Sequence, residues 1–387
     1  MRICLIYDCL YPHTVGGAER WYRSVAERLV ADGHEVTYLT LRQWDRGAEA
    51  GLDGVTVRTV GPRMSLYTSS GRRRILPPLM FGLGVLVHLL RHRRRYETVH
   101  TASFPYFSLL AAGLARRTGG YRLVVDWHEV WTLEYWREYL GVAAGTVGWL
   151  VQRICARIPQ RAFCFSQLHA RRLQSEGLRG NVVVLTGEYD GKHVGPLEVS
   201  EPDPLVLFVG RLIPEKCAPA VVEAIAHLRG SLPQIRGKII GDGPERDAVR
   251  QAVIDHGLEE VVDLPGFVDA DEVQAAFSRA MCLVLPSRRE GYGQVVIEAA
   301  AHGTPSIIVA GADNAAVELL SDGENGFVAP SALAADLAAA VLRVRDGGST
   351  LRDATAAWFD THVERLSVSA SLDVVSDAYG LVRSAAS

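Results

Sequence analysis

The chain has 387 residues, enough for two or three domains, and its 48% content of hydrophobic residues is typical of a soluble globular protein. No apolar run approaches the ~18 residues that a membrane-spanning helix needs. The net charge of −3 is unevenly divided: residues 1–195 contain 26 Lys and Arg against 16 Asp and Glu, and residues 196–387 contain 15 against 28. The basic half predicts an anionic partner, but no nucleic-acid-binding motif accompanies it, which argues against nucleic acid.

The six cysteines are scattered without the spacing of a metal site or a redox motif, which predicts reduced thiols. The first eight residues have the pattern of a buried strand rather than of a signal peptide. Both features favour a cytoplasmic protein.

Residues 3–7 are predicted to form a strand, 18–32 a helix and 35–40 a second strand, a β-α-β unit typical of doubly wound folds. The intervening loop ends in Gly16-Gly17, where the free N–H groups of the helix start can approach an anion. The alternative is a plain tight turn into the helix. The Gly-x-Gly-x-x-Gly fingerprint does not follow the strand, which argues against a NAD-dependent dehydrogenase.

Residues 71–95 place an apolar segment between two arginine clusters, at positions 72–74 and at 91 and 93–95. The segment is too short and too interrupted by Pro and Gly to span a bilayer. Two interpretations stay open. The segment could lie on an anionic membrane surface, where each basic residue contributes about 1 kcal/mol, or form a core helix with solvated arginines at its end.

Strands are next predicted at 98–101 and 123–126, with a helix over 106–117, and 163–166 is predicted as the last strand of this half. His128 lies just past the strand at 123–126. Ligands of open parallel sheets bind at the carboxyl ends of strands, so this position favours a functional histidine over a structural one. Four aromatic residues follow that could stack on sugar rings or pack in the core: Trp131, Tyr135, Trp136 and Tyr139.

Residues 187–204 are polar, and the charge balance changes sign there. We therefore predict one Rossmann-like domain over 1–190, a linker over 191–204 and a second Rossmann-like domain over 205–366.

In the second domain, a strand predicted at 205–209 is followed by Arg211 and Lys216. The guanidinium offers a fork of donors and the ammonium a compact charge, a pair that suits a diphosphate. A surface loop with two basic residues is the alternative. Another strand begins near 238 and ends in a turn that contains Gly241 and Gly243.

Residues 281–309 predict a strand, a loop, a helix over 294–302 and a second strand. Glu290 lies in the loop and Glu298 about one turn into the helix, with the free N–H groups of the helix start between them. A carboxylate, an anion site and a second carboxylate match the sugar hydroxyls, diphosphate and ribose hydroxyls of a nucleotide sugar. The alternative is an ordinary strand-loop-helix with one surface glutamate.

A helix over 314–320, a strand over 325–328 and helices over 332–345 and 367–384 are predicted to complete the chain.

These motifs resemble those of the retaining glycosyltransferases of family 4, within glycosyl transferase group 1. The resemblance rests on Glu290-Gly-Tyr-Gly followed by Glu298, on Gly210-Arg-Leu with Lys216, on the double glycine of the first loop and on His128. The motifs follow in the expected order over nearly the whole chain. The chain departs from the family at Cys217, where Gly is usual, and at residues 186–190, where Asn-Gly-Val-Asp is common.

The resemblance implies the GT-B fold, with two doubly wound domains facing each other across a cleft. The N-terminal domain would bind the acceptor, the second domain the nucleotide-sugar donor, and residues 367–387 would form a helix that crosses back to the first domain. The implied catalytic residues are His128, Glu290, Arg211 and Lys216. The implied donor-binding residues are Gly16, Gly17, Gly241, Gly243, Gly291, Tyr292, Gly293, Val295 and Glu298.

The implied reaction is retaining transfer of a hexose-type sugar from a UDP- or GDP-linked donor to an acceptor hydroxyl, without a metal or another cofactor. The basic first half predicts an anionic or lipid-linked acceptor in glycan, glycolipid or cell-envelope polysaccharide synthesis, with peripheral contact at the inner face of the membrane. The alternatives are a soluble natural-product acceptor, a nucleotide-sugar epimerase or phosphorylase, and a non-catalytic nucleotide-sugar-binding protein on the same fold.

Overall fold

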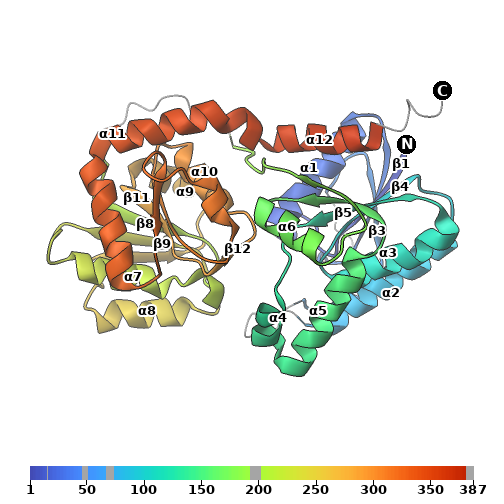
Figure 1. The fold of residues 1–387 in the computed structure, drawn as a ribbon, viewed down its shortest axis with the longest axis horizontal. Helices are drawn as coiled ribbons and strands as arrows, with labels where there is room; N and C mark the ends of the chain where they lie inside the picture. Colours follow the sequence, from blue (N-terminus) through green and yellow to red (C-terminus); the bar gives the residue numbers. More distant parts are fainter. Residues whose placement is uncertain (15, 46–50, 67–73, 192–201, 381–387) are drawn as a thin grey trace. The chain divides into compact units, whose positions relative to one another are not determined.

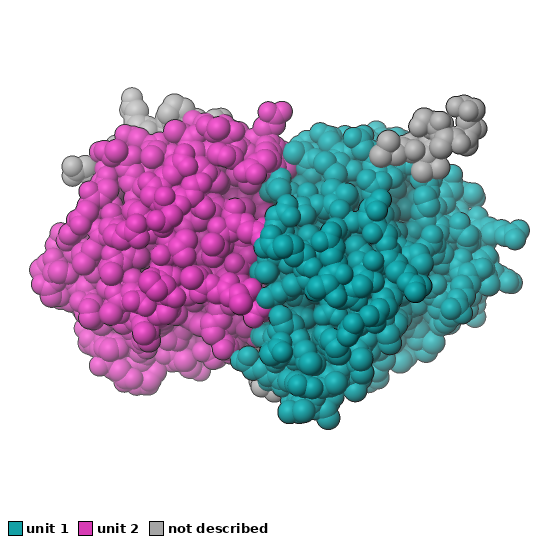
Figure 2. Space-filling model, viewed as in Figure 1, with its two compact units in different colours: residues 1–188, 368–387 teal, residues 189–367 magenta. Residues whose placement is uncertain are grey.

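The computed structural model describes residues 1–14, 16–45, 51–66, 74–191 and 202–380, and the chain divides into two compact units. Unit 1 comprises Met1–Glu188 with Val368–Ser387, and unit 2 comprises Tyr189–Ser367 (Figure 1, Figure 2). The chain therefore enters unit 2 once and returns to unit 1 for its last helix. Most of the predicted linker, residues 192–201, lies outside the described residues.

Unit 1 is built on a seven-stranded parallel sheet. In sheet order its strands are β3 (Val55–Thr59), β2 (Glu35–Thr40), β1 (Arg2–Ile6), β4 (Thr98–Ala102), β5 (Arg122–Trp127), β6 (Gln160–Cys164) and β7 (Gly180–Val184). The order reverses between β1 and β4, which defines the switch point of a doubly wound sheet. Every residue of β4 is buried, as expected for a strand covered on both faces by helices.

Seven helices are described in unit 1. They are α1 (Gly17–Ala31), α2 (Leu76–Arg91), α3 (Tyr106–Gly119), α4 (Leu133–Leu140), α5 (Val142–Ala156), α6 (Gln167–Ser175) and α12 (Val368–Gly380). The last of these packs on α1, where Arg28 Nη2 donates to Asp373 Oδ1 at 2.6 Å and Ser376 Oγ donates to Asp32 Oδ2 at 2.8 Å. Side-chain bonds thus attach the C-terminal helix to the first helix of the chain.

Unit 2 contains a six-stranded parallel sheet. In sheet order its strands are β10 (Val262–Gly266), β9 (Arg236–Ile240), β8 (Leu205–Val209), β11 (Cys282–Leu285), β13 (Ser306–Val309) and β15 (Gly326–Ala329). A separate two-stranded sheet pairs β12 (Arg289–Glu290) with β14 (Asp313–Asn314). The helical segments are η1 (Pro214–Lys216), α7 (Pro219–Leu228), α8 (Arg246–Asp255), α9 (Ala270–Arg279), α10 (Gln294–Ala300), η2 (Ala315–Leu319) and α11 (Ala334–Leu366). The switch point of this sheet lies between β8 and β11.

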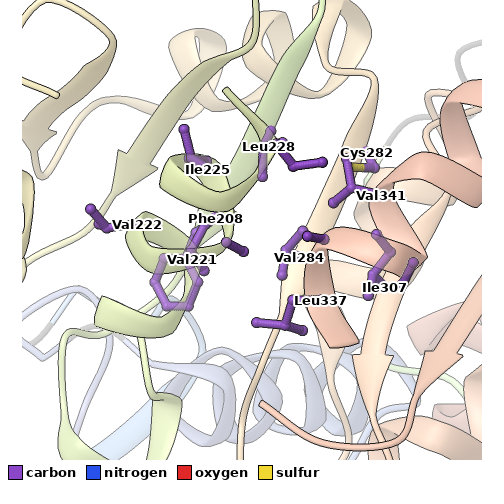
Figure 3. Close-up of a cluster of buried hydrophobic side chains, with 14 of the residues drawn as sticks. Phe208, Val221, Val222, Ile225, Leu228, Cys282, Val284, Ile307, Leu337 and Val341 are labelled. Carbon is purple, nitrogen blue, oxygen red and sulfur yellow. The ribbon is translucent and has the colours of Figure 1, made fainter. Parts of the chain in front are cut away.

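Alternating strand residues build two cores in unit 2, one on each face of the sheet. Val206 and Phe208 of β8 face a cluster with α7 and α11, in which Val221, Ile225 and Leu337 are fully buried (Figure 3). Leu207 faces the opposite cluster, which includes Phe277 of α9. Helices on both faces leave only the ends of the strands open for ligands.

Two short elements differ from their predictions. The strand predicted at 163–166 is β6, which begins at Gln160, and it is not the last strand of its half because β7 follows it. The segment predicted as a helix over 314–320 is β14 followed by the 3-10 turn η2. Asn314 explains this turn, since its side-chain oxygen accepts a hydrogen bond from the N–H of Ala316 at 3.1 Å and so competes with helical bonding.

The helix predicted over 332–345 continues to Leu366 as α11, with one non-helical residue at Gly348, where φ is +49°. The glycine pair at 347–348 has the pattern of a stop signal. The helix resumes because Leu351, Trp358 and Phe359 beyond it are buried. Packing therefore overrides the local signal.

The segment at 71–95 combines features of both interpretations. Its residues 71–73 lie outside the described part of the chain, and Leu76–Arg91 forms α2. One face of α2 buries Phe81, Val85 and Leu89, whereas a second apolar stripe stays 38–54% exposed. The stripe consists of Leu79, Leu83, Val87 and Leu90. Among the described residues, no helix is long and apolar enough to cross a membrane.

We predict that Phe208→Ala lowers the free energy of unfolding of unit 2 by about 3–5 kcal/mol, because the substitution leaves a cavity in a closed core. Phe267→Ala is the matched control, since Phe267 is 79% exposed and its loss is expected to change stability by less than about 0.5 kcal/mol. Urea unfolding monitored by circular dichroism measures both. Equal effects of the two substitutions would contradict the core assignment.

Candidate functional site

The predicted site residues of unit 2 gather where three adjacent strands end. Arg211 follows β8, Gly241 follows β9, and Glu290 lies in the segment after β11. The switch point lies between β8 and β11, where the loops of a doubly wound sheet diverge and leave room for a ligand.

Lys216 and Glu290 form an ion pair between Nζ and Oε1, although they lie 74 positions apart in the sequence. The same carboxylate oxygen accepts a hydrogen bond from Ser287 Oγ at 2.7 Å. Only 8% of the Glu290 side chain and 19% of the Lys216 side chain are exposed. Removal of one partner from such a pair leaves an uncompensated charge in a largely buried place.

The segments that follow β8, β11 and β13 hold this pair in place. Glu290 pairs with Asn314 in the small sheet, and Asn314 Nδ2 donates to the carbonyl oxygens of Ser287 at 3.0 Å and Val309 at 2.9 Å. The N–H of Arg288 donates to the carbonyl oxygen of Glu215 at 2.9 Å, which ties the loop to η1. Sequence reasoning missed Ser287 and Asn314 as positioning residues. Their signal was a buried polar residue shortly after a strand end.

Cys217 occupies a left-handed backbone conformation, with φ of +51°. This is the position at which the family usually has Gly, which adopts that conformation without strain. The cysteine keeps the turn after Lys216 and points its Sγ at the carbonyl oxygen of Pro214, 3.4 Å away. The departure in the sequence therefore preserves the shape of the loop.

Gly241 and Gly243 lie against the loop that carries Arg211. Their φ values are +139° and +155°, and a Cβ on them would lie 1.9 Å from the oxygen of Gly210 and 2.3 Å from that of Leu212. No other residue type fits such contacts. The loops after β8 and β9 therefore pack backbone against backbone.

Gly293 precedes α10 with φ of +101°, and its Cβ would lie 2.6 Å from the Cβ of Ala316. Gly291, Tyr292 and Val295 adjoin it, and Tyr292 is buried. Glu298 is half-buried on α10 and close enough to Tyr189 to affect that phenol, although burial is the main cause that raises the pKa of Tyr189 to about 12. Arg211 is exposed and has no ion-pair partner among the described residues.

In unit 1, Gly16 and Gly17 begin α1 after the first strand, as predicted, and residue 15 lies outside the described part. A Cβ on Gly16 would lie 2.4 Å from Oε2 of Glu19, whose side chain folds back over the helix start. Gly17 is exposed and is the first residue of the helix. The backbone is therefore open to close approach at Gly17, whereas the Glu19 carboxylate covers it at Gly16.

His128 follows β5, as predicted, and its ring stacks on Phe165 with centroids 4.5 Å apart. Burial lowers the pKa of His128, an effect that Asp126 opposes. The ring therefore favours its neutral form. Its Nε2 atom is buried without a hydrogen-bond partner among the described residues. A buried, unpartnered ring nitrogen is suited to bind a hydroxyl group of a ligand.

A buried polar network lies behind His128. Asp126 accepts a hydrogen bond from Trp21 Nε1 at 2.8 Å, and its other oxygen lies 2.7 Å from Nε2 of His100, whose Nδ1 lies 2.5 Å from the hydroxyl of Tyr379. Burial alone would raise the pKa of Asp126, but His100 and the hydrogen bonds outweigh it and lower the pKa. Sequence reasoning missed this network because His100 lies inside a strand and Tyr379 in the last helix.

The aromatic residues after His128 belong mainly to the core of unit 1. Tyr135 and Trp136 are buried, and Trp136 Nε1 donates to Gln152 Oε1 at 3.2 Å. Trp131 packs edge-on against Tyr135 with centroids 4.8 Å apart. Among the described residues, no three His, Cys, Asp or Glu side chains are grouped so that they could hold a metal ion.

Two family models match the chain: Glycosyltransferase Family 4 over residues 15–187 and Glycosyl transferases group 1 over residues 192–357. The sucrose-phosphate synthase of Thermosynechococcus elongatus has the same fold, with a TM-score of 0.80, 19% identity and full coverage of both chains. The structure is thus a GT-B fold with two parallel-sheet domains. The chain belongs to the family 4 and group 1 glycosyltransferases, and the predicted family and fold are confirmed.

Two curated relatives align over part of their length. The alpha-D-kanosaminyltransferase of Streptomyces kanamyceticus is 34% identical over 37% of this chain and 36% of its own. The GDP-mannose-dependent alpha-(1-6)-phosphatidylinositol monomannoside mannosyltransferase of Mycolicibacterium smegmatis is 32% identical over 32% of this chain and 34% of its own. The match thus spans about a third of the length of each relative.

Glu188 is a further ionisable group of unit 1 that sequence reasoning did not single out. Burial raises its pKa from an ordinary value of 4.5 to about 8, and the nearby Asp126 carboxylate adds to the effect against the opposing charge of Arg20. At pH 7 the folded protein therefore holds this carboxyl group protonated, whereas the unfolded chain ionises it.

We predict that the stability of unit 1 falls as pH rises from about 4.5 to about 8, because the unfolded chain then releases a proton that folded Glu188 keeps. Glu188→Gln lacks this pH-dependent loss of stability. Between about pH 4.5 and pH 8 its free energy of unfolding is therefore expected to rise relative to that of the wild type, by on the order of a few kcal/mol. Urea unfolding at pH 5 and pH 8 measures the difference. Glu27→Gln, on the exposed side of α1, is the control and is expected to follow the wild type.

Proposed function

We propose that this protein is a retaining glycosyltransferase that moves a hexose-type sugar from a UDP- or GDP-linked donor to an acceptor hydroxyl, without a metal ion or another cofactor. The contact between Lys216 and Glu290 carries the proposal, because a cation of the kind that suits a diphosphate lies beside a carboxylate of the kind that suits sugar hydroxyls. Membership of the family supports the reaction class.

Each unit has a distinct task in the proposal. In unit 2, Arg211, Lys216 and the backbone after Gly293 bind the diphosphate, Glu298 binds the ribose, and the glycine loop at 241–243 adjoins the nucleotide. Glu290 binds the sugar. In unit 1, Nε2 of His128, which has no partner among the described residues, is assigned to a sugar hydroxyl. The backbone at Gly16 and Gly17 is assigned to the donor phosphates, whose binding requires the Glu19 carboxylate to move off Gly16.

The proposed reaction needs no covalent bond to the protein. The bond between the anomeric carbon and the diphosphate oxygen breaks, and the acceptor oxygen attacks the same face of the sugar. The departing phosphate oxygen takes the proton of the acceptor hydroxyl, and the nucleoside diphosphate leaves. Arg211 and Lys216 stabilise the negative charge that develops on the leaving group. This electrostatic stabilisation is expected to lower the activation barrier for sugar transfer more than any other effect.

We predict that Lys216→Met lowers kcat/KM for sugar transfer roughly 100- to 1,000-fold, because one cation no longer faces the leaving group. Lys238→Met is the matched control. Lys238 lies in the same unit, pairs with Glu272 at 2.8 Å and has a side chain that is 21% exposed. It differs from Lys216 in that it lies in the middle of β9 and not in a loop at the switch point. The control is expected to keep its kcat/KM within about threefold of the wild type.

The assay combines each UDP- or GDP-linked hexose with an acceptor and follows the product by NMR, which reports the configuration at the anomeric carbon. An unchanged configuration supports retention, and an inverted one contradicts it. An epimerase would convert the donor without an acceptor. A binding protein would show a thermal shift with the donor but no turnover.

We further propose that the acceptor is lipid-linked or otherwise anionic and that unit 1 makes peripheral contact with the inner face of an anionic membrane. Exposed apolar stripes on two helices support this. On α2 the stripe of Leu79, Leu83, Val87 and Leu90 adjoins exposed arginines at 91, 93 and 94, and the helix contains no acidic residue. On α5 the stripe consists of Val147, Leu150 and Ile154, which are 47–60% exposed. Apolar residues flanked by arginine suit an anionic lipid surface.

We predict that the protein co-sediments with phosphatidylglycerol vesicles at low salt and that Leu79→Glu/Leu83→Glu lowers the bound fraction about tenfold. Leu333→Glu, at an exposed leucine of unit 2, is expected to bind as the wild type does. Higher salt weakens binding by screening the arginines. Wild-type protein that stays in the supernatant at low salt would contradict the membrane proposal and favour a soluble acceptor.

A further inference from the structure

Unit 1 has a cavity of about 470 Å³ at the amino-terminal edge of its sheet. Its walls come from the starts of β4, β5, β6 and β7 and from the end of α12. The candidate site residues of unit 1 follow the carboxyl ends of strands in the same sheet. A parallel strand of five residues separates the two edges by roughly 16 Å, so the cavity is distinct from that site.

Four arginines line the cavity: Arg116, Arg122, Arg161 and Arg179. None of the described residues that line it is Asp or Glu. Cations gathered in a partly enclosed space repel one another unless an anion joins them. The lining therefore has an unbalanced positive charge.

Two of the four arginines are held by the fold. Arg116 Nε donates to the carbonyl oxygen of Tyr121 at 3.0 Å, and Arg122 Nη1 donates to that of Tyr379 at 3.4 Å. These bonds orient two guanidinium groups and leave their positive charge unpaired.

The side chains of the other two arginines form no hydrogen bond or ion pair within the part of the chain that the structure describes, and the guanidinium of Arg161 lies 5.9 Å from the centroid of the Phe163 ring. Nε of Arg161 is buried without an acceptor, and Arg179 is exposed at the start of β7. A second buried polar atom of the lining, Oγ1 of Thr98, also lacks a partner, although Thr98 is only 1% exposed. Buried donors without acceptors are rare and call for a ligand or an ordered water.

We propose that this cavity binds a phosphate-bearing small molecule, a phosphate monoester or a diphosphate, at a site separate from that of the sugar donor. Guanidinium forks match phosphate oxygens in geometry and charge, and Thr98 adds a hydroxyl donor. The volume lies within the range of small-molecule pockets. This cavity can bind an anion whether or not the protein transfers sugars.

The bound anion would also contact the last helix of the chain. Ala378 and Tyr379 line the cavity, and the hydroxyl of Tyr379 belongs to the network with His100 and Asp126. Binding is therefore expected to slow amide exchange at the end of α12 and at the starts of β6 and β7.

Inorganic pyrophosphate is the probe, titrated calorimetrically into the full chain. Because the donor site also suits a diphosphate, the comparison uses Lys216→Met to weaken that site and Arg161→Gln/Arg179→Gln to weaken the cavity. The wild type is expected to show two sites. In the double arginine variant, the affinity of the cavity for pyrophosphate is expected to fall at least about tenfold. In the Lys216 variant, the cavity is expected to bind pyrophosphate as it does in the wild type. Arg117→Gln, at an exposed arginine next to Arg116 that does not line the cavity, is expected to match the wild type.

Hydrogen exchange with pyrophosphate locates the site through protection at the starts of β6 and β7 in the Lys216 variant. Arg179→Gln alone tests the proposal if the double variant does not fold, since Arg179 is exposed. Pyrophosphate binding in Lys216→Met that is undetectable, or that survives the arginine substitutions with unchanged affinity, would overturn the proposal. Neither result bears on the proposed donor site, which is tested separately by the effect of Lys216→Met on kcat/KM.

Discussion

The candidate site of unit 2 depends on the buried ion pair between Lys216 and Glu290. Both side chains are largely shielded from water, so loss of either partner leaves the charge of the other uncompensated until a ligand supplies a new one. The pair also joins the loop after β8 to the loop after β11, the two strands on either side of the switch point. A nucleotide sugar that bound here would replace one strong interaction with two, a phosphate on the lysine and hydroxyl groups on the carboxylate.

Unit 1 supports its own candidate residue with a comparable buried network. Asp126 is fully buried and is stabilised by Trp21 and His100. Its charge opposes the lowering effect of burial on the pKa of His128, which lies two positions further along the chain. The His128 ring therefore favours its neutral form, stacks on Phe165 and has one buried nitrogen without a partner among the described residues. Such a group is suited to orient a hydroxyl rather than to carry a charge.

Sequence reasoning located the strand-end residues well because their signals are local. A buried strand followed by Gly, Arg or Glu is visible without a structure, and the order of strands places these ends at one edge. It missed Asn314, whose side chain replaces a helical turn, and the continuation of α11 past Gly348. These features depend on packing between distant segments. The His100–Asp126–Tyr379 network spans 279 positions between His100 and Tyr379, and no spacing rule connects them.

The polarity of a parallel sheet explains why unit 1 can hold two different sites. All strands run in one direction, so one edge collects the loops that follow strands and the other collects the residues that begin them. In unit 1 the first edge carries His128 and the second carries four arginines. Tyr379 connects the two indirectly, since it lines the cavity and its hydroxyl contacts His100 in the middle of β4, which in turn contacts Asp126. The last helix is thus the element through which an anion at one edge would affect the network behind His128 at the other.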